Sequence, residues 1–321
     1  DVSTGEVLWC RSYPPSVVQS AVEVDAAGDL YFTAGSSLIS VNSDGEPRWE
    51  RSFSNDGEDD APWGQHFTPD GHVATVTSSG NVYLVRRTDG EVLASLSIPE
   101  TWGFVAPESI DLQLDLASLL PTEILADIEA VWGPPEEDDA SMGIGGLLGA
   151  SGFSDNTVGI SPRGRIYVIG GGPDSETGAL VQIHVEGSTS APVLSAGWYS
   201  PTSRGSATSP SISADSRWVT VGDGASTGAV LNPGNSDAHA LVMDIDACDA
   251  NTDSNPDPGV CGVAFQDDME RTAMIGSPAI LPDGTILFWE LGLDFSADPQ
   301  DRDVVALGPD GILWEASLPG D

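Results

Sequence analysis

The chain contains no lysine. All 11 of its basic residues are arginines, against 50 aspartates and glutamates, so the formal net charge is −39 over 321 residues. A surface this acidic repels nucleic acid and anionic membranes, which makes both poor partners, and we expect no nucleic-acid partner. The acid excess indicates adaptation to high salt or to a calcium-rich exterior, where screening removes the self-repulsion. For the missing lysine, a GC-rich genome combined with selection for solubility is an equally good explanation.

Long apolar runs are missing as well, and cysteine is scarce. No run approaches the ~20 residues that a membrane-spanning helix needs, so we expect no membrane span. Two of the three cysteines, Cys248 and Cys261, bracket a polar loop that offers no apolar burial to free thiols. This favours a disulfide over two unpaired thiols, and with it an extracellular, periplasmic or cell-surface location. Cys10 is left without an assigned partner.

Glycine and proline are abundant, with 37 and 23 residues, and they mark recurring turns. Asp-Gly or Thr-Gly turns run into short apolar segments at 4–9 (TGEVLW), 44–49 (DGEPRW), 89–94 (DGEVLA) and 310–314 (DGILW). A second group of turns precedes aromatic strands, at 27–32, 70–73, 163–167 and 283–288. These turns mark a unit that recurs about every 40 to 50 residues. Because such a unit cannot bury its own apolar face, we expect the copies to pack against one another.

The turns divide the chain into five units of short strands. These units span 17–53, 65–98, 157–199, 209–265 and 275–318. Four strands per unit are typical of a propeller blade. We therefore predict an all-β fold, a β-propeller of four-stranded blades in which five full blades are visible and six to eight are possible. Residues 1–321 would form this single domain, with truncation at its ends left open.

Two segments stand outside the five units. The segment 4–9 has no preceding strands of its own, so we predict that it is the outermost strand of a further blade. An insertion at 99–154 interrupts the repeats, and a helix is predicted near 122–132, because Ile124 and Ile128 fall on one apolar face and Gly133 follows. An insertion of this size on a regular ring often carries function.

The pattern TGEVLW at the end of a blade, preceded by a strand of small apolar residues, resembles the repeats of pyrroloquinoline-quinone (PQQ)-type propellers. The resemblance covers most of the chain outside the insertion. The resemblance implies that a tryptophan packs between neighbouring blades; the matching positions are Trp9, Trp49 and Trp314, whereas Ala94 departs from the pattern. The family includes quinoprotein dehydrogenases and non-catalytic relatives such as the outer-membrane assembly lipoprotein. The dehydrogenases carry an adjacent cysteine pair at the quinone. This chain has none, so we do not expect PQQ as a cofactor.

The loop between the paired cysteines is the candidate metal site. Oxygen-bearing side chains alternate there with small residues, in the manner of a calcium loop: Asp249, Asn251, Asp253, Asn255 and Asp257. Calcium prefers six to eight such ligands. The pattern departs from an EF-hand, since Ser254 replaces the turn glycine and Val260 stands where a bidentate glutamate is needed. The alternative is a solvated acidic loop without metal.

No hydrolase motif is present, and the four histidines are scattered along the sequence. We therefore predict a non-enzymatic, exported scaffold that binds a protein or cell-surface partner and that calcium stabilises. One alternative is an enzyme that uses the central funnel, either a quinone-dependent oxidoreductase or a metal-assisted hydrolase or lyase. Another is a surface-layer subunit whose missing strands come from a neighbouring chain.

Overall fold

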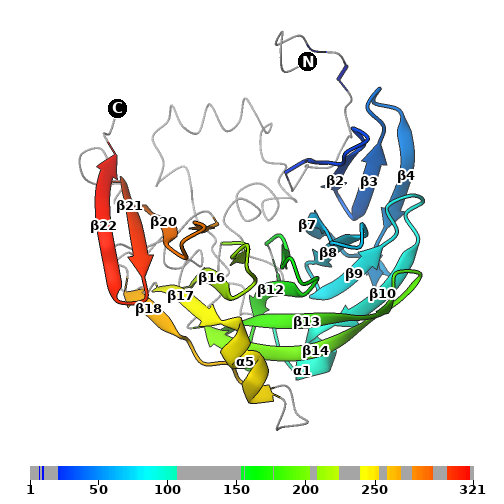
Figure 1. Cartoon of the computed structure of the whole chain (residues 1–321). Helices are drawn as coiled ribbons and strands as arrows, with labels where there is room; N and C mark the ends of the chain where they lie inside the picture. The colour runs from blue at the N-terminus through cyan, green and yellow to red at the C-terminus, as the bar shows by residue number, and fades with distance from the viewer. Residues whose placement is uncertain are drawn as a thin grey trace, which may run out of the picture.

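The computed structural model describes residues 7, 9–10, 21–106, 153–154, 156–175, 177–202, 208–223, 239–252, 259–268, 277–291 and 302–318. Within these residues, five four-stranded antiparallel sheets follow one another along the chain. They lie side by side in an arc around a common centre, with the first and fifth sheets at its two ends (Figure 1). This is the predicted β-propeller arrangement, and we name the sheets blade 1 to blade 5.

Each blade is a meander of four strands. Blade 1 has β1 (Glu23–Val24), β2 (Leu30–Ala34), β3 (Ser37–Val41) and β4 (Pro47–Ser52). A small hairpin, β5 (Ser54–Asn55) and β6 (Glu58–Asp59), leads to blade 2, with β7 (Pro62–Phe67), β8 (Val73–Thr77), β9 (Asn81–Val85) and β10 (Val92–Ser97). Blade 3 has β11 (Gly159–Ile160), β12 (Ile166–Gly171), β13 (Gly178–Ser188) and β14 (Ala191–Thr202).

The last two blades repeat this order. Blade 4 has β15 (Ser211–Ile212), β16 (Trp218–Asp223), β17 (His239–Asp244) and β18 (Phe265–Asp268), with helix α5 (Ile245–Thr252) between β17 and β18. Blade 5 has β19 (Ala279–Ile280), β20 (Ile286–Leu291), β21 (Arg302–Gly308) and β22 (Gly311–Leu318).

Blade 4 extends beyond its predicted unit. That unit is predicted to end at residue 265, but the outer strand β18 only begins at Phe265. The preceding backbone is held by blade 3 instead: Val260 forms a bridge with Tyr199, and the Cys261 N–H donates to the Tyr199 carbonyl at 2.7 Å. The strand can pair with β17 only after the chain has left this contact.

The apolar core lies between neighbouring blades. One cluster joins Tyr31, Leu38 and Trp49 of blade 1 to Val73 and Val85 of blade 2. Equivalent clusters join blade 2 to blade 3, blade 3 to blade 4, and blade 4 to blade 5. A blade therefore buries its apolar side chains only when its neighbour is in place.

A tryptophan contact recurs between blades, as the family resemblance implies. The Trp49 ring lies on the turn of blade 2, where a Cβ on Gly90 would be 2.7 Å from it, and the indole N–H donates to the Arg87 carbonyl at 2.9 Å. Trp9 lies in the same way on Gly45 of blade 1, and its N–H donates to a carbonyl of that turn at 2.9 Å. Only a glycine leaves room for the indole at these positions.

The two segments outside the predicted units are described in part. Val7, Trp9 and Cys10, the described residues at the start of the chain, belong to no strand. The insertion begins with a short helix, α1 (Ile98–Trp102), which Gly103 ends at φ +70°. The helix predicted near 122–132 lies outside the described residues. Among the helices that are described, none has the length and apolar character to cross a membrane.

Candidate functional site

Two matching turns place arginines at the start of the second strands of blades 3 and 4. In blade 3 the Gly164 N–H donates to the Ser161 carbonyl at 2.8 Å, and the Arg165 N–H donates to the Ser161 hydroxyl at 3.1 Å. The turn 213–217 of blade 4 has the same two bonds, at 2.9 and 3.1 Å. Arg165 and Arg217 therefore occupy equivalent positions, each directly before the second strand of its blade.

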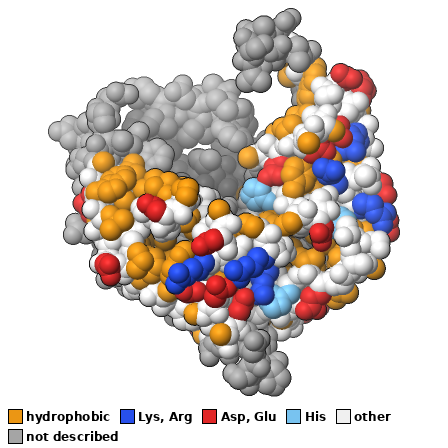
Figure 2. Space-filling view, in the orientation of Figure 1, with side chains coloured by type: hydrophobic (Ala, Val, Ile, Leu, Met, Phe, Trp, Pro, Cys, Tyr) orange, Lys and Arg blue, Asp and Glu red, His pale blue; other side chains and the backbone are white. Residues whose placement is uncertain are grey.

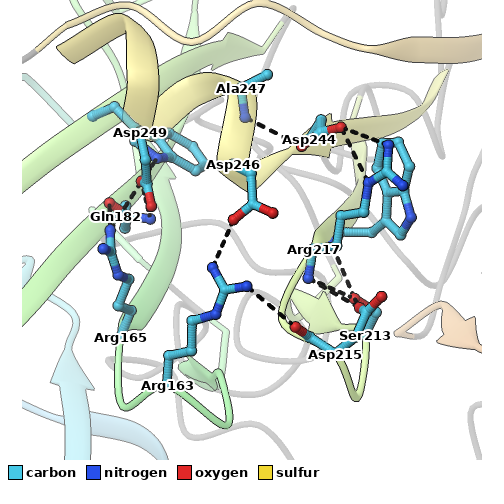
Figure 3. Close-up of polar contacts among 12 residues, drawn as sticks. Arg163, Arg165, Gln182, Ser213, Asp215, Arg217, Asp244, Asp246, Ala247 and Asp249 are labelled. Carbon is cyan, nitrogen blue, oxygen red and sulfur yellow. Dashed lines mark hydrogen bonds and ion pairs between the residues drawn. The ribbon is translucent and has the colours of Figure 1, made fainter. Parts of the chain in front are cut away.

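Helix α5 supplies the opposing carboxylates. Asp244 ends β17, and its Oδ1 accepts from the Ala247 N–H at 3.2 Å, which caps the helix. Asp246 and Asp249 follow on α5 three residues apart, a spacing that puts both side chains on one side of a helix. Figure 3 shows them directed toward the arginine turns. We call the resulting surface the Arg–Asp face: Arg163, Arg165, Asp215, Arg217, Asp244, Asp246 and Asp249.

Asp249 is the centre of a polar network that ties α5 to blade 3. Its Oδ1 accepts from Arg165 Nη1 at 2.9 Å, from Trp198 Nε1 at 3.1 Å and from Gln182 Nε2 at 3.2 Å (Figure 3). Arg165 Nη1 also lies 3.0 Å from His184 Nε2. These partners come from β13, from β14 and from the turn before β12 of blade 3, so the network fixes the start of the disulfide loop against the neighbouring blade.

Two further ion pairs lie closer to solvent. Arg163 Nη1 donates to Asp246 Oδ1 at 2.6 Å, which joins blade 3 to α5 a second time. Arg217 pairs with Asp244 at 3.2 Å, and its guanidinium lies over the Trp218 ring at 4.5 Å. Basic and acidic side chains gather over blades 3 and 4 in the middle of the view (Figure 2). Pairs this exposed are worth about 0.2–1 kcal/mol each.

The pKa values of three groups in this region are shifted from their usual ranges. Hydrogen bonding to Asp246 raises the pKa of the Arg163 guanidinium. Burial lowers the pKa of the His184 imidazole, and the Arg165 guanidinium lowers it further. Burial also raises the pKa of the Tyr167 hydroxyl well above its usual range. The histidine and tyrosine are therefore neutral beside permanently charged arginines.

A cavity of about 400 Å³ adjoins the face and opens to solvent. The predicted disulfide between Cys248 and Cys261 is present and forms part of its wall. The remaining lining residues are Asp244, Ala247, Gly262, Val263 and Ala264. The cavity is thus mostly apolar, with one carboxylate at its edge.

The predicted metal residues are described only in part. Asp249 lies on α5, where one of its oxygens already accepts three hydrogen bonds. Asn251 lies on the same helix, and Asp253, Asn255 and Asp257 fall outside the described residues. The described part of the chain contains no cluster of three or more metal-binding side chains. Calcium binding therefore stays a prediction.

His66 and His72 lie apart, as expected of scattered histidines. They flank one turn but contact different blades: His66 pairs with Glu23 of blade 1, and His72 Nε2 lies 2.8 Å from the Thr189 carbonyl of blade 3. The sequence patterns predicted no functional role for any arginine of the Arg–Asp face. The available signal was that Arg163 and Arg165 flank the glycine of a blade-entry turn.

Comparison with known proteins gives structural neighbours only. No protein family matches the chain, and no curated protein does. BamB from Moraxella catarrhalis is 11% identical at a TM-score of 0.49, covering 94% of this chain. The β-propeller domain of Myceliophteria thermophila Cps50 (Swd1) is 12% identical, with a TM-score of 0.49 and 95% coverage. A europium-containing methanol dehydrogenase is 11% identical, with a TM-score of 0.47 and 86% coverage. The chain spans 64% of BamB, 74% of the Cps50 domain and 51% of the dehydrogenase.

Proposed function

We propose that this protein is a binding scaffold that recognises a protein partner through the Arg–Asp face. The observation that carries the proposal is the juxtaposition of ordered charges from two blades with an open, mostly apolar cavity. Protein-recognition sites combine an apolar pocket for an anchoring side chain with a polar rim that sets orientation. Blades 3 and 4 provide both features on one surface.

The charges of the face define the partner's chemistry. Arg163 and Arg217 are about half exposed, and a guanidinium has five N–H donors. Each is already paired with an aspartate of the face, so a partner's carboxylate would bind to the N–H donors that remain beyond the pair. The adjoining cavity accepts a small apolar side chain against Val263 and the disulfide. The expected partner segment therefore carries an apolar anchor beside an acidic residue.

A peptide-display selection against the immobilised protein tests this function directly. Peptides enriched on the unmodified protein are measured against Arg217→Ala and against Arg86→Ala, which removes an exposed, ion-paired arginine of blade 2. We expect enriched peptides to pair an apolar with an acidic residue and to lose about tenfold in affinity on Arg217→Ala only, equivalent to about 1.4 kcal/mol. Peptides that bind all three proteins equally would place recognition elsewhere.

The proposal extends to the compartment and to calcium. The disulfide supports an oxidising location, extracellular, periplasmic or at the cell surface. The oxygen spacing in the loop supports calcium, and because Asp249 Oδ1 is engaged, we expect the ion on the oxygens of 251–257. EDTA should then lower the melting temperature and added Ca²⁺ restore it, whereas Mg²⁺ should not. If neither EDTA nor added Ca²⁺ changes the melting temperature, calcium does not stabilise the protein and this part of the proposal is wrong.

A further inference from the structure

The dipeptide Asp-Gly occurs seven times in the chain, and six of these pairs lie within the described residues. Glycine has no side chain to shield its amide nitrogen, so this nitrogen can attack the carboxyl carbon of the preceding aspartate. The attack requires a glycine N–H that is not held in a hydrogen bond and a backbone that can rotate. The structure distinguishes the six pairs on both requirements.

In four pairs the glycine N–H is bound within a blade turn, and we call these the blade-turn pairs. Their N–H groups donate to backbone carbonyls at 2.8–2.9 Å: Gly45 to Asn42, Gly71 to Thr68, Gly90 to Arg86 and Gly284 to Leu281. Gly311 of the fifth pair is a partner of Gly308 in the β21–β22 ladder. Among the described residues, none accepts a hydrogen bond from the Gly57 N–H. Asp56–Gly57 therefore has the accessible nitrogen.

Asp56 and Gly57 form the tip of the β5–β6 hairpin, which lies outside the blades. This sheet has only two strands, joined by two residue pairs. Every residue from 54 to 59 is exposed, and an added Cβ on Gly57 would meet nothing within 4 Å. Asp56 also has a positive φ, +52°, which strains an L-residue. A two-stranded hairpin without a buried face is only marginally stable, so its tip opens at little cost.

The base of the hairpin is fixed, so this opening stays local. Phe53 is buried in the core between blades 1 and 2, and its carbonyl accepts from the Asp60 N–H at 3.3 Å. The Asp60 carboxylate is buried and accepts from the Thr77 hydroxyl at 2.6 Å and from the Ser79 N–H at 3.0 Å. The tip can therefore rotate without unfolding a blade, whereas a blade-turn pair is held by its four-stranded sheet.

We propose that Asp56 is a modification site, where aspartate isomerises spontaneously to isoaspartate, the substrate of protein isoaspartyl methyltransferases. The Gly57 nitrogen bonds to Cγ of Asp56, and the carboxyl OH leaves with the amide proton as water. Water then opens the succinimide ring. Attack at the main-chain carbonyl of Asp56 leaves the chain running through Cβ, which is isoaspartate, and attack at Cγ restores aspartate. One water leaves and one enters, so no other reactant is needed. This inference does not depend on the proposed binding function.

Incubation of the folded full chain in water labelled with heavy oxygen tests the site, at neutral pH and below the melting temperature. Each passage through the succinimide incorporates one solvent oxygen, and peptide mass spectrometry measures this label separately at every Asp-Gly pair. We expect labelling at Asp56 to be at least about tenfold faster than at the blade-turn pairs, equivalent to about 1.4 kcal/mol of additional opening free energy for those turns. Labelling at Asp56 that is no faster than theirs would overturn the proposal.

Two controls separate the structural cause from the dipeptide itself. In urea all the pairs should take up label at similar rates, because only the folded structure distinguishes them; a persistent excess at Asp56 would show that the hairpin is not the cause. After incubation of the folded protein, Asp56→Gly should remove most of the methyl groups that an isoaspartyl methyltransferase transfers, and glycine fits the positive φ. Asp70→Gly, in a blade-turn pair, should not. Equal methylation of the two variants would also overturn the proposal.

Discussion

At the scale of single residues, the contact between blades depends on a glycine that a tryptophan covers. Gly90 and Gly71 both lie in turns of blade 2 with positive φ, which disfavours any side chain. They differ in what an added Cβ would meet: the Trp49 ring at 2.7 Å for Gly90, and nothing within 4 Å for Gly71. The pair therefore separates the cost of backbone strain from the cost of a lost contact.

Gly71→Ala should reduce the free energy of unfolding by about 1–2 kcal/mol, the cost of a left-handed alanine. Gly90→Ala should lose that amount and about 1–3 kcal/mol more, because the methyl group overlaps the indole. Urea unfolding followed by circular dichroism measures both. Equal losses for the two variants would show that Trp49 does not lie on the turn.

His184 gives the molecule a stability that depends on pH. Burial and Arg165 lower its pKa in the folded protein, so the unfolded chain binds the proton more tightly. Its contribution is therefore fully present above the unfolded pKa of about 6.5 and is lost as the pH falls toward the folded value. The unfolding free energy of the unmodified protein relative to His184→Gln should fall between pH 7.5 and 5.5. A constant difference over this range would contradict the assignment.

At the scale of elements, α5 connects blade 3 to blade 4. Asp249 accepts from three donors in a partly buried site, whereas Asp246 on the same helix pairs with Arg163 near solvent. The helix thus carries two carboxylates of equal charge in different surroundings. Burial, rather than charge, should decide how much each contributes.

Asp249→Ala should lower the unfolding free energy by about 2–3 kcal/mol, since it leaves Arg165, Gln182 and Trp198 without their acceptor; full burial would make the loss larger. Asp246→Ala serves as the matched control and should cost about 0.2–1 kcal/mol. Chemical unfolding of the two variants under identical conditions measures the difference. Similar losses would mean that the network does not hold the helix.

Sequence patterns predict the strands well because each blade repeats local signals. The glycine turns recognised at 27–32, 70–73 and 283–288 contain the first residues of β2, β8 and β20. The predicted disulfide is present, but the reason given for it was wrong: Cys248 and Cys261 are both buried in the apolar cluster between blades 3 and 4. The turn between the first and second strands of blade 4 does not show the glycine signal. There Ser216 adopts the positive φ, +60°, that a glycine has in the corresponding turns of the other blades.

The candidate site is harder to predict than the strands. Two of its ion pairs, Arg163–Asp246 and Arg165–Asp249, join residues 83 and 84 positions apart, and the sequence contains 50 acidic residues that could be the partners. Only the packing of blade 3 against blade 4 selects the partners. The late start of β18 has the same origin, since the contact of Cys261 with Tyr199 is made between blades.

At the scale of the whole molecule, stability is shared between neighbouring sheets. Each main apolar cluster joins two blades, and the tryptophan contacts and the Arg165–Asp249 pair also cross between blades. A single four-stranded blade would leave these side chains exposed. The inner blades 2, 3 and 4 should therefore unfold together rather than one at a time.

Native-state hydrogen exchange tests this claim most directly. The amides of β8, β12 and β16, which are the second strands of blades 2, 3 and 4, report the free energy of opening of each blade. The shared cores predict values within about 1 kcal/mol of one another, close to the global unfolding free energy. Three well-separated values, each changed only by mutations within its own blade, would contradict it.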